Sequence, residues 1–302
     1  MRLTFAHAYL KTLNELMIKP DIAFSCRGLA MWKELTAHTA TIEIKDREIE
    51  VFSHRWHRVT PIRFTLAELC YILAGRDDVE SIASYNKAMV HYSDDGQRMV
   101  GSYGLRLRHQ LLPLIDRLTK DIHTRQACAA IYNEDDGVTT TRTHLPCNVF
   151  LQFLCRPPHL NLHVVSRSSD FATGFSIDTI HWQALLIMMA NELAAKLGQQ
   201  IYPSYIFYTI GSLHIYKADT DVIQQWTTEM GDGSRPYHAE RYAFHIRMNL
   251  GLSEAVDRAK NMFKADLSIE ELGEILMLNV DSMYNVKIMH EKFLSHRNKL
   301  VR

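Results

Sequence analysis

The sequence has no excess of either charge, no long hydrophobic run and no C-x-x-C pair, and each absence excludes a class of protein. Its 302 residues include 34 Lys and Arg against 34 Asp and Glu, so the formal net charge is zero. A balanced chain has no electrostatic reason to bind nucleic acid or an anionic membrane. No apolar run approaches the ~20 residues that cross a bilayer. We therefore expect neither nucleic acid nor a membrane as a partner.

Cysteine is sparse and scattered along the chain. The five cysteines stand at positions 26, 70, 128, 147 and 155. An odd number without paired spacing favours a reduced, cytoplasmic protein over a disulfide scaffold. Residues 1–18 carry polar side chains every few positions, which predicts an amphipathic helix rather than a signal peptide.

Internal repeats, low-complexity tracts and long Gly/Ser/Pro linkers are also missing. The length is long for one domain and short for two independent ones, and a hydrophobic content of 47% is enough for a large core. We expect a single catalytic domain over residues 1–302, in which residues from about 217 to 302 form a helical C-terminal segment.

Hydrophobic periodicity predicts an α+β fold, with one large sheet covered by helices. Residues 40–53 alternate around a Lys45-Asp46 turn, which is typical of a hairpin. Further strands are expected at 127–132, 147–155, 162–166 and 204–210. Helices are expected at 65–75, 79–90, 104–121, 178–197, 219–230, 252–263, 268–277 and 280–296.

Polar residues interrupt the apolar elements at four places. THLPCNVFLQF puts Cys147 directly before a predicted strand, and SRSSDFATGFSID follows another strand with an arginine, serines and two aspartates. GSLHIY places His214 and Tyr216 two residues apart, and therefore on one face of a strand. FTLAELCYILAG carries Glu68 inside an otherwise apolar helix.

Together these stretches resemble the thymidylate synthase superfamily, from about Arg27 to Tyr216, or roughly two thirds of the chain. Pro146-Cys147 followed by Gln152-Phe153 matches the nucleophile strand of the family. Three shorter matches follow the same chain order. They are Glu68-Leu69 of the catalytic glutamate helix, Tyr103-Gly104 near the active site, and Thr124-Arg125 of a phosphate turn that the partner subunit supplies.

The second half of the resemblance covers the ligand motifs. Arg167-Ser168-x-Asp170 with Gly174 matches the phosphate and folate motif, and His214-x-Tyr216 matches the sugar-binding pair. Two departures resemble the deoxycytidylate (dCMP) and CMP hydroxymethylases more closely than thymidylate synthase itself. Asp178 replaces the asparagine that reads uracil, and Asn148 replaces the histidine after the nucleophile.

The resemblance implies a thymidylate synthase-like fold with a large mixed sheet, a homodimer, and a pyrimidine nucleotide hydroxymethylase. Cys147 would add as a thiolate to carbon-6 of a cytidylate, dCMP more than CMP, with Arg167 favouring its ionisation. Carbon-5 would take a one-carbon unit from 5,10-methylenetetrahydrofolate, and water would complete the 5-hydroxymethyl group. Glu68 would move protons.

The remaining roles follow from the same motifs. The catalytic set is Cys147, Glu68, Asp178 and Tyr103. The nucleotide-binding set is Arg27, Arg125 of a second subunit, Arg167, Ser168, Asp178, His214, Tyr216 and Asn148. The folate set is Asp170, Gly174, Met89 and Glu68.

Asp178 would select cytosine. Its acid proton can be donated to N3 while its other oxygen accepts from the exocyclic amine, and partial burial would keep that proton available by raising the pKa. Val90 at the position of the family's indole, and a chain ending in SHRNKLVR rather than a short apolar tail, favour water over hydride transfer.

Structural alternatives remain for several of these residues. Cys147 could be an inert buried thiol, Thr65-x-x-Glu68 could be a capping box, and Asp178 could be a helix N-cap. Asp170 could be a turn residue, and Arg27 an ordinary surface arginine. His214 could be a core histidine.

Other functions also stay open. A dUMP hydroxymethylase or a thymidylate synthase-type methyltransferase would use the same residues, and a non-catalytic nucleotide-binding homologue would not need the thiol. His54 with His57 and His159 with His163 suggest a metal site, but no companion ligands complete one, so we expect no metal.

Overall fold

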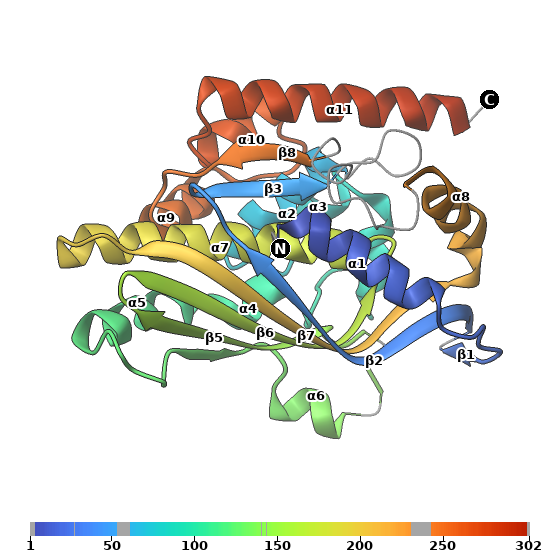
Figure 1. Ribbon diagram of the computed structural model, residues 1–302. Helices are drawn as coiled ribbons and strands as arrows, with labels where there is room; N and C mark the ends of the chain where they lie inside the picture. Colours follow the sequence, from blue (N-terminus) through green and yellow to red (C-terminus); the bar gives the residue numbers. More distant parts are fainter. Residues whose placement is uncertain are drawn as a thin grey trace.

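A six-stranded mixed sheet forms the base of the molecule (Figure 1). The computed structural model describes residues 4–26, 28–52, 61–139, 141–142, 144–230 and 243–300. The strand order is β1-β2-β7-β6-β5-β4, in which only the β6–β7 pair is parallel. The bounds are β1 Ser25–Cys26, β2 Leu29–Glu43, β4 Cys128–Ala130, β5 Asn148–Arg156, β6 His159–Asp170 and β7 Tyr202–Tyr216. The predicted α+β fold with a large sheet is confirmed.

The predicted hairpin at 40–53 is confirmed only at its turn, and the pairing of its two strands is wrong. β2 pairs with β7, whereas β3 (Glu48–Phe52) pairs with β8 (Ala243–Arg247) in a separate two-stranded sheet. A single bridge joins Lys45 to Glu48. Asp46 and Arg47 have φ values of 51° and 58°, and two consecutive left-handed residues form the tight turn of a hairpin. Beyond this turn the two strands separate, because each pairs with a distant strand. Local alternation could not reveal that each strand has a distant partner.

The long helix α7 (Gly174–Leu197) packs across one face of the large sheet, and most of its residues are buried. Further helices pack beside α7 on the sheet or stack beyond it, so that the sheet is covered on this face (Figure 1). They include α1 Phe5–Met17, α2 Ile62–Leu73, α4 Tyr103–Leu107 and α5 Leu111–Lys120. The shorter elements are α3 Val79–Ala83, η1 Lys87–Tyr92, α6 Glu134–Val138 and η2 Lys217–Asp219.

The expected helices at 79–90 and 104–121 are each divided in two. Asn86 accepts the Ala88 N–H and starts η1 separately from α3. Between α4 and α5, the side-chain amide of Gln110 donates to the carbonyl of Ala130 and accepts the N–H of the same residue. Gln110 thereby ties the break to strand β4, and such a tertiary contact leaves no mark in local periodicity.

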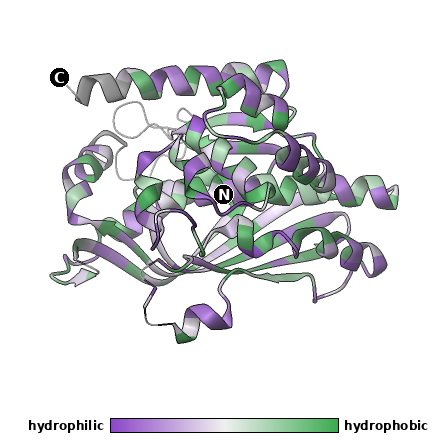
Figure 2. Cartoon of the chain, turned by 180° about the vertical axis from the view of Figure 1, so that it is seen from behind, coloured by the Kyte–Doolittle hydropathy of each residue, from purple (hydrophilic) through white to green (hydrophobic). Residues whose placement is uncertain are grey.

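The C-terminal segment is mostly helical, as predicted, but it also contains strand β8. Its helices are α8 Thr220–Met230, α9 Leu252–Met262, α10 Ile269–Ile275 and α11 Val280–Leu300. Hydrophilic and hydrophobic residues alternate along α11 (Figure 2). None of the described helices is long and apolar enough to cross a membrane. The expectation of one catalytic domain over the whole chain stays a prediction.

Candidate active site

A cavity of about 1770 Å³ opens at the carboxyl ends of the parallel strands β6 and β7. It gathers side chains from segments that lie far apart in the sequence. Eleven residues predicted to act in the site line it: Glu68, Met89, Tyr103, Cys147, Arg167, Ser168, Asp170, Gly174, Asp178, His214 and Tyr216. Asn148 is fully buried behind this wall. The sequence motifs therefore converge on one place in the fold.

Cys147 stands immediately before β5 with its sulfur facing Arg167 of β6. The distance from Sγ to the guanidinium Nη2 is 3.8 Å. Arg167 is held in place because its Nε donates to the Pro146 carbonyl at 3.0 Å and its Nη2 to the Leu145 carbonyl at 2.8 Å. A fixed positive charge beside a partly exposed thiol favours the thiolate. This arrangement fits a nucleophile better than an inert core cysteine.

Asp178 belongs to a buried network of hydrogen bonds behind the cavity wall. Its Oδ2 accepts from Nδ2 of Asn148 at 2.8 Å and from the hydroxyl of Tyr208 at 3.1 Å. The same Asn148 Nδ2 donates to the Tyr103 hydroxyl oxygen at 2.8 Å. Burial raises the pKa of Asp178 to about 6, against the opposing effect of the two donors. Both the acid and the carboxylate are therefore accessible near neutral pH.

The alternative of Asp178 as an N-cap is wrong. Helix α7 begins at Gly174 with Thr173 in the capping position, so that Asp178 lies one turn inside the helix. The position of an aspartate before an apolar run suggested a cap, but the helix extends further toward its N-terminus than the apolar periodicity indicated. Asp178 consequently points a carboxyl group at the cavity from the first turns of α7.

Glu68 likewise does not close a capping box. Helix α2 begins at Ile62, and the Thr65 hydroxyl donates to the carbonyl of Pro61 at 3.2 Å from within the helix. The Glu68 side chain, 21% exposed, faces the cavity. Burial, and secondarily the charge of Asp178, raises the pKa of Glu68 to about 8. A carboxyl that keeps its proton at neutral pH is suited to general acid–base work.

His181 of α7 lies beside Glu68 and was not predicted from the sequence. Its Nε2 donates to the Thr65 carbonyl at 3.0 Å and lies 3.8 Å from the Glu68 carboxyl. Burial lowers the pKa of His181 to about 4, so the ring is neutral. The pair is therefore a neutral imidazole next to a protonated acid, not an ion pair at neutral pH.

His214 and Tyr216 lie at the end of β7, with ring centroids 4.8 Å apart. His214 is 5% exposed, and its buried Nε2 has no hydrogen-bond partner among the described residues. A buried polar nitrogen at a cavity wall is costly unless a ligand or water completes its bonding. This favours a ligand contact over a satisfied core histidine.

Asp170 holds the turn that leads into α7. Its Oδ1 accepts the Ala172 N–H at 2.9 Å, and its Oδ2 accepts the Thr173 hydroxyl. The turn alternative is therefore correct in part, and it is compatible with a ligand role because Asp170 also lines the cavity. A Cβ on Gly174 would meet only the Ser169 hydroxyl, at an ordinary 3.5 Å, so the protein itself does not require glycine there.

One predicted nucleotide ligand among the described residues does not reach this cavity. Arg125 is exposed near the start of β4, outside the cavity lining. Arg27, together with His54 and His57, lies outside the described residues. Among the residues that the structure describes, no group of three His, Cys, Asp or Glu side chains could hold a metal ion. His159 and His163 both lie on strand β6.

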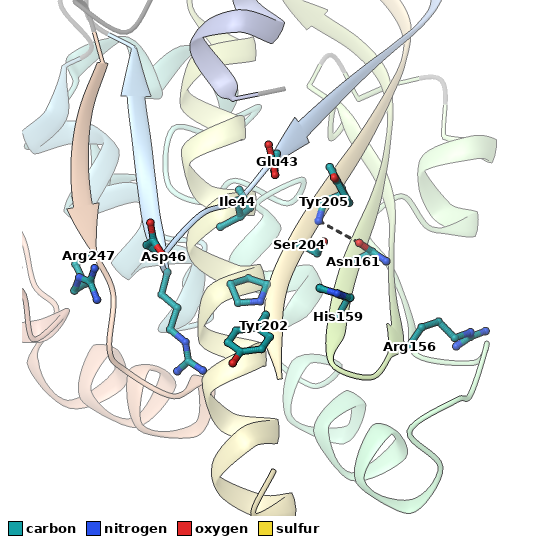
Figure 3. A pocket seen from close by; sticks show the side chains of 12 residues that line it. Glu43, Ile44, Asp46, Arg156, His159, Asn161, Tyr202, Ser204, Tyr205 and Arg247 are labelled. Atoms are coloured by element: carbon teal, nitrogen blue, oxygen red, sulfur yellow. Dashed lines mark hydrogen bonds between the residues drawn. The ribbon is translucent and has the colours of Figure 1, made fainter. Parts of the chain in front are cut away.

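The C-terminal segment adds a wall to the cavity that the sequence did not suggest. Trp226 of α8 and His290, Phe293 and Leu294 of α11 line it. A second hollow of about 700 Å³ lies at the opposite, amino ends of β6 and β7, around Tyr202 and His159 (Figure 3). It contains none of the predicted site residues.

Comparison with known proteins identifies the fold family. The sequence profile of the thymidylate synthase family matches residues 8–239. A deoxyuridylate hydroxymethyltransferase of Bacillus phage SP01 is 36% identical over 173 residues, which cover 52% of this chain and 44% of the relative. One of Pseudomonas phage M6 is 30% identical over 143 residues, covering 45% and 40% respectively.

More distant relatives carry the family name itself. A thymidylate synthase of Streptococcus pyogenes is 24% identical over 192 residues, covering 59% of this chain and 65% of the relative. The matched region spans less than half the length of the two phage relatives. Because the profile covers well over half of the sequence, and because its motifs meet in one cavity, the chain belongs to the thymidylate synthase family.

Proposed function

We propose that the protein is a folate-dependent one-carbon transferase that hydroxymethylates carbon-5 of a cytidylate, with dCMP preferred over CMP. The observation that carries the proposal is the placement of the Cys147 thiol beside Arg167 in the same cavity as the carboxyl of Asp178. A thiol nucleophile and a base-reading acid facing one space are what addition to a pyrimidine ring requires.

Cys147 starts the reaction. Its thiolate adds to carbon-6, which moves electron density onto carbon-5 and N3. Bound 5,10-methylenetetrahydrofolate supplies carbon-5 with an electrophilic one-carbon unit. A base then removes the carbon-5 proton as tetrahydrofolate leaves the transferred carbon, which gives an exocyclic methylene. Water adds to this methylene carbon, and the thiolate leaves carbon-6 to restore the ring double bond. Glu68, with its high pKa, is suited to accept and return protons in these steps.

The cavity fits the folate as well as the nucleotide. Its volume of about 1770 Å³ exceeds the space that one drug-sized ligand fills. Trp226 lines it, and the buried indole Nε1 of this residue has no hydrogen-bond partner among the described residues. Met89, Asp170 and Gly174 would hold the folate together with Glu68.

Arg167 and Ser168 would bind the nucleotide phosphate, and His214 with Tyr216 the sugar hydroxyl. Arg125 would complete the phosphate site from a second subunit, and two features support a homodimer. Arg125 is exposed on its own subunit, and the face of the large sheet opposite α7 carries few covering elements (Figure 1). Phe207 on the central strand β7 is 38% exposed, as expected of a surface that a second copy covers.

Asp178 supports a cytosine base. Cytosine presents an acceptor at N3 and a donor at its exocyclic amine, which an acid can match with its O–H and its carbonyl oxygen. Uracil presents the reverse pattern. Because burial raises the pKa of Asp178 to about 6, about half of the molecules carry the proton needed for N3 at pH 6 and about a tenth at pH 7.

Deoxyuridylate hydroxymethylation is the second candidate, and the names of the two phage relatives favour it. A thymidylate synthase-type methyl transfer is the third candidate, and membership of the thymidylate synthase family favours it. Release of tritium from 5-tritiated dCMP, CMP and dUMP, each with methylenetetrahydrofolate, shows which of the three nucleotides is the substrate. We expect dCMP to release tritium fastest and the folate product to be tetrahydrofolate. Dihydrofolate as the product would instead indicate methyl transfer.

A non-catalytic nucleotide-binding protein is the alternative of another class. The same assay tests it with Cys147→Ala, which should still bind the nucleotide but release no tritium. Tritium release at an undiminished rate in this variant would remove Cys147 from the mechanism. No release from any nucleotide in the unsubstituted protein, with binding retained, would favour the non-catalytic alternative.

A further inference from the structure

Tyr208 lies behind the base-reading carboxyl, and the proposed mechanism gives it no role. It is a fully buried residue of β7 whose hydroxyl lies 3.1 Å from Oδ2 of Asp178 and 3.2 Å from Oδ1 of Asn148. Asn148 in turn donates to the same Oδ2. The three side chains form a closed ring of hydrogen bonds, and the recorded bonds of the Asp178 carboxyl all end on Oδ2. Oδ1 takes no part in them.

The ring fixes the orientation of the Asn148 amide. Its Nδ2 has two hydrogens, which reach the Tyr103 hydroxyl oxygen and Asp178 Oδ2 at 2.8 Å each. Its Oδ1 is left to accept from Tyr208. A flipped amide would place an oxygen against a carboxylate oxygen, so only one orientation satisfies the ring when Asp178 is ionised.

Tyr208 has one proton and two acceptors within reach. When Asp178 is ionised, the carboxylate Oδ2 is the stronger acceptor and takes the Tyr208 hydrogen bond. When Asp178 is neutral with its proton on Oδ2, that proton can be donated to the Tyr208 oxygen, while Tyr208 donates to Asn148. If the Asp178 proton were on Asp178 Oδ1 instead, Asp178 Oδ2 and Asn148 Oδ1 would both be acceptors for the single Tyr208 proton. One of these two oxygens would then lack a hydrogen bond from Tyr208. The ring is therefore complete in the neutral state only when the proton sits on Oδ2.

We propose that Tyr208 is a positioning residue for base specificity, because it keeps the Asp178 proton on Oδ2 and thereby leaves Oδ1 as a hydrogen-bond acceptor. With Oδ1 opposite the substituent at carbon-4, this arrangement accepts the amine of cytosine and repels the carbonyl of uracil. In the free protein, Asp178 Oδ2 donates its proton in a hydrogen bond to the Tyr208 oxygen. In the complex, Oδ2 donates the same proton in a hydrogen bond to N3 of the base. The inference rests on the proposed function, since it concerns how Asp178 reads the base.

Without the Tyr208 hydroxyl, the proton can sit on either oxygen. The arrangement with the proton on Oδ1 presents a donor to carbon-4 and an acceptor to N3, which is the pattern that uracil needs. Titratable groups around this site come from several elements: Glu68 of α2, Tyr103 of α4, Cys147 before β5 and Tyr208 of β7. Burial raises the pKa of Tyr208 well above its usual range, so Tyr208 keeps its proton throughout the working range.

The test is Tyr208→Phe, made in a Cys147→Ser background so that binding is measured without chemistry. Isothermal titration with dCMP and with dUMP gives the ratio of the two affinities at pH 5.5, 6.5 and 7.5. Because one directed hydrogen bond is lost, we expect the ratio to fall about fivefold to tenfold in favour of dUMP. Tyr202→Phe, on the same strand but outside the cavity, is the matched control and should leave the ratio unchanged.

An equal loss of affinity for both nucleotides, with the ratio unchanged within about twofold, would show that Tyr208 only supports the fold and would overturn the inference. If Tyr208→Phe does not fold, as checked by its thermal melt, Asn148→Ala breaks the same ring and should move the ratio the same way. Which nucleotide the Cys147→Ser protein binds more tightly tests the proposed function separately. A preference there for dUMP would contradict the cytidylate assignment, whereas only the change between variants bears on Tyr208.

Discussion

The side-chain amide of Asn148 donates to the carboxyl of Asp178 at 2.8 Å. Asn148 directly follows the cysteine whose sulfur faces Arg167. Asn148, the neighbour of the candidate nucleophile Cys147, therefore contacts Asp178, the candidate base-reading residue. In the proposed mechanism, one short stretch of backbone would therefore set both the attack at carbon-6 and the recognition of the opposite ring edge.

Asp178→Asn should move the preference from cytosine to uracil. An amide here would keep its oxygen where Asn148 and Tyr208 donate to it. In that orientation it presents an acceptor to N3–H and a donor to O4 of uracil, and no donor to N3 of cytosine. One mismatched hydrogen bond at a buried site costs about 1–3 kcal/mol, so kcat/KM for dCMP relative to dUMP should fall about fivefold to 150-fold. Tritium release from the two nucleotides measures the ratio, and an unchanged preference would refute the assignment of Asp178.

Arg167→Gln should make Cys147 less reactive. The guanidinium lies 3.8 Å from the sulfur, and removing its charge leaves less thiolate at neutral pH. Alkylation by iodoacetamide at pH 7 should slow roughly threefold to tenfold. Peptide mass spectrometry distinguishes Cys147 from the exposed Cys26. Arg117→Gln, whose side chain contacts Gln126 outside the cavity, is the control. Equal alkylation rates in the two variants would contradict a role for Arg167 in ionisation.

Glu68→Gln should stabilise the protein increasingly as the pH rises. The ordinary pKa near 4.5 applies to the unfolded chain, whereas burial raises the folded value to about 8. The folded state therefore binds the Glu68 proton more tightly than the unfolded chain does. This contribution to the free energy of unfolding is fully present below pH 4.5 and is lost as the pH rises from about 4.5 through 8. Thermal melts at pH 5 and pH 8 should show a gap in Tm between variant and unsubstituted protein that widens at pH 8. A constant gap would mean that Glu68 is ionised in the fold.

The dimer prediction can be tested by mixing two inactive proteins. Arg125→Ala leaves Cys147 intact, and Cys147→Ala leaves Arg125 intact. If Arg125 acts on the neighbouring subunit, each mixed dimer has one complete site. Equal mixing gives half mixed dimers, so about one quarter of the original activity should return. Recovery should be absent if Arg125 serves its own subunit or if the protein is a monomer.

The sequence was sufficient to bring together the residues whose motifs have fixed spacing. Cys147, Arg167 and Asp178 sit at the ends of elements whose periodicity is clear, and such ends meet at the edge of a sheet. Tyr208 was missed because a tyrosine in an apolar strand usually packs in the core. Tyr208 and His214 are an even number of residues apart on the strand, so they lie on the same face. This was the one available signal that Tyr208 faces the side of the sheet that carries the site.

Tertiary contacts explain the other differences. β2 and β3 alternate as a hairpin would, but each pairs with a strand about 160 to 200 residues later, as in Glu43 with Tyr205 and Glu48 with Arg247. Thr65 and Glu68 have the spacing of a capping box, yet Pro61 starts the helix earlier. Phe293 of α11 reaches the cavity only because the C-terminal helices fold back over α2.

A covalent trap tests the central claim most directly. Fluorine at carbon-5 cannot leave as a proton does, so the reaction of 5-fluoro-dCMP with methylenetetrahydrofolate should stop after the one-carbon transfer, with the nucleotide bonded to Cys147. Mass spectrometry should show the protein plus both ligands, with the modified peptide containing Cys147 and with faster formation from 5-fluoro-dCMP than from 5-fluoro-dUMP. A protein that forms no adduct with either nucleotide, or that forms it only with 5-fluoro-dUMP, would contradict the account.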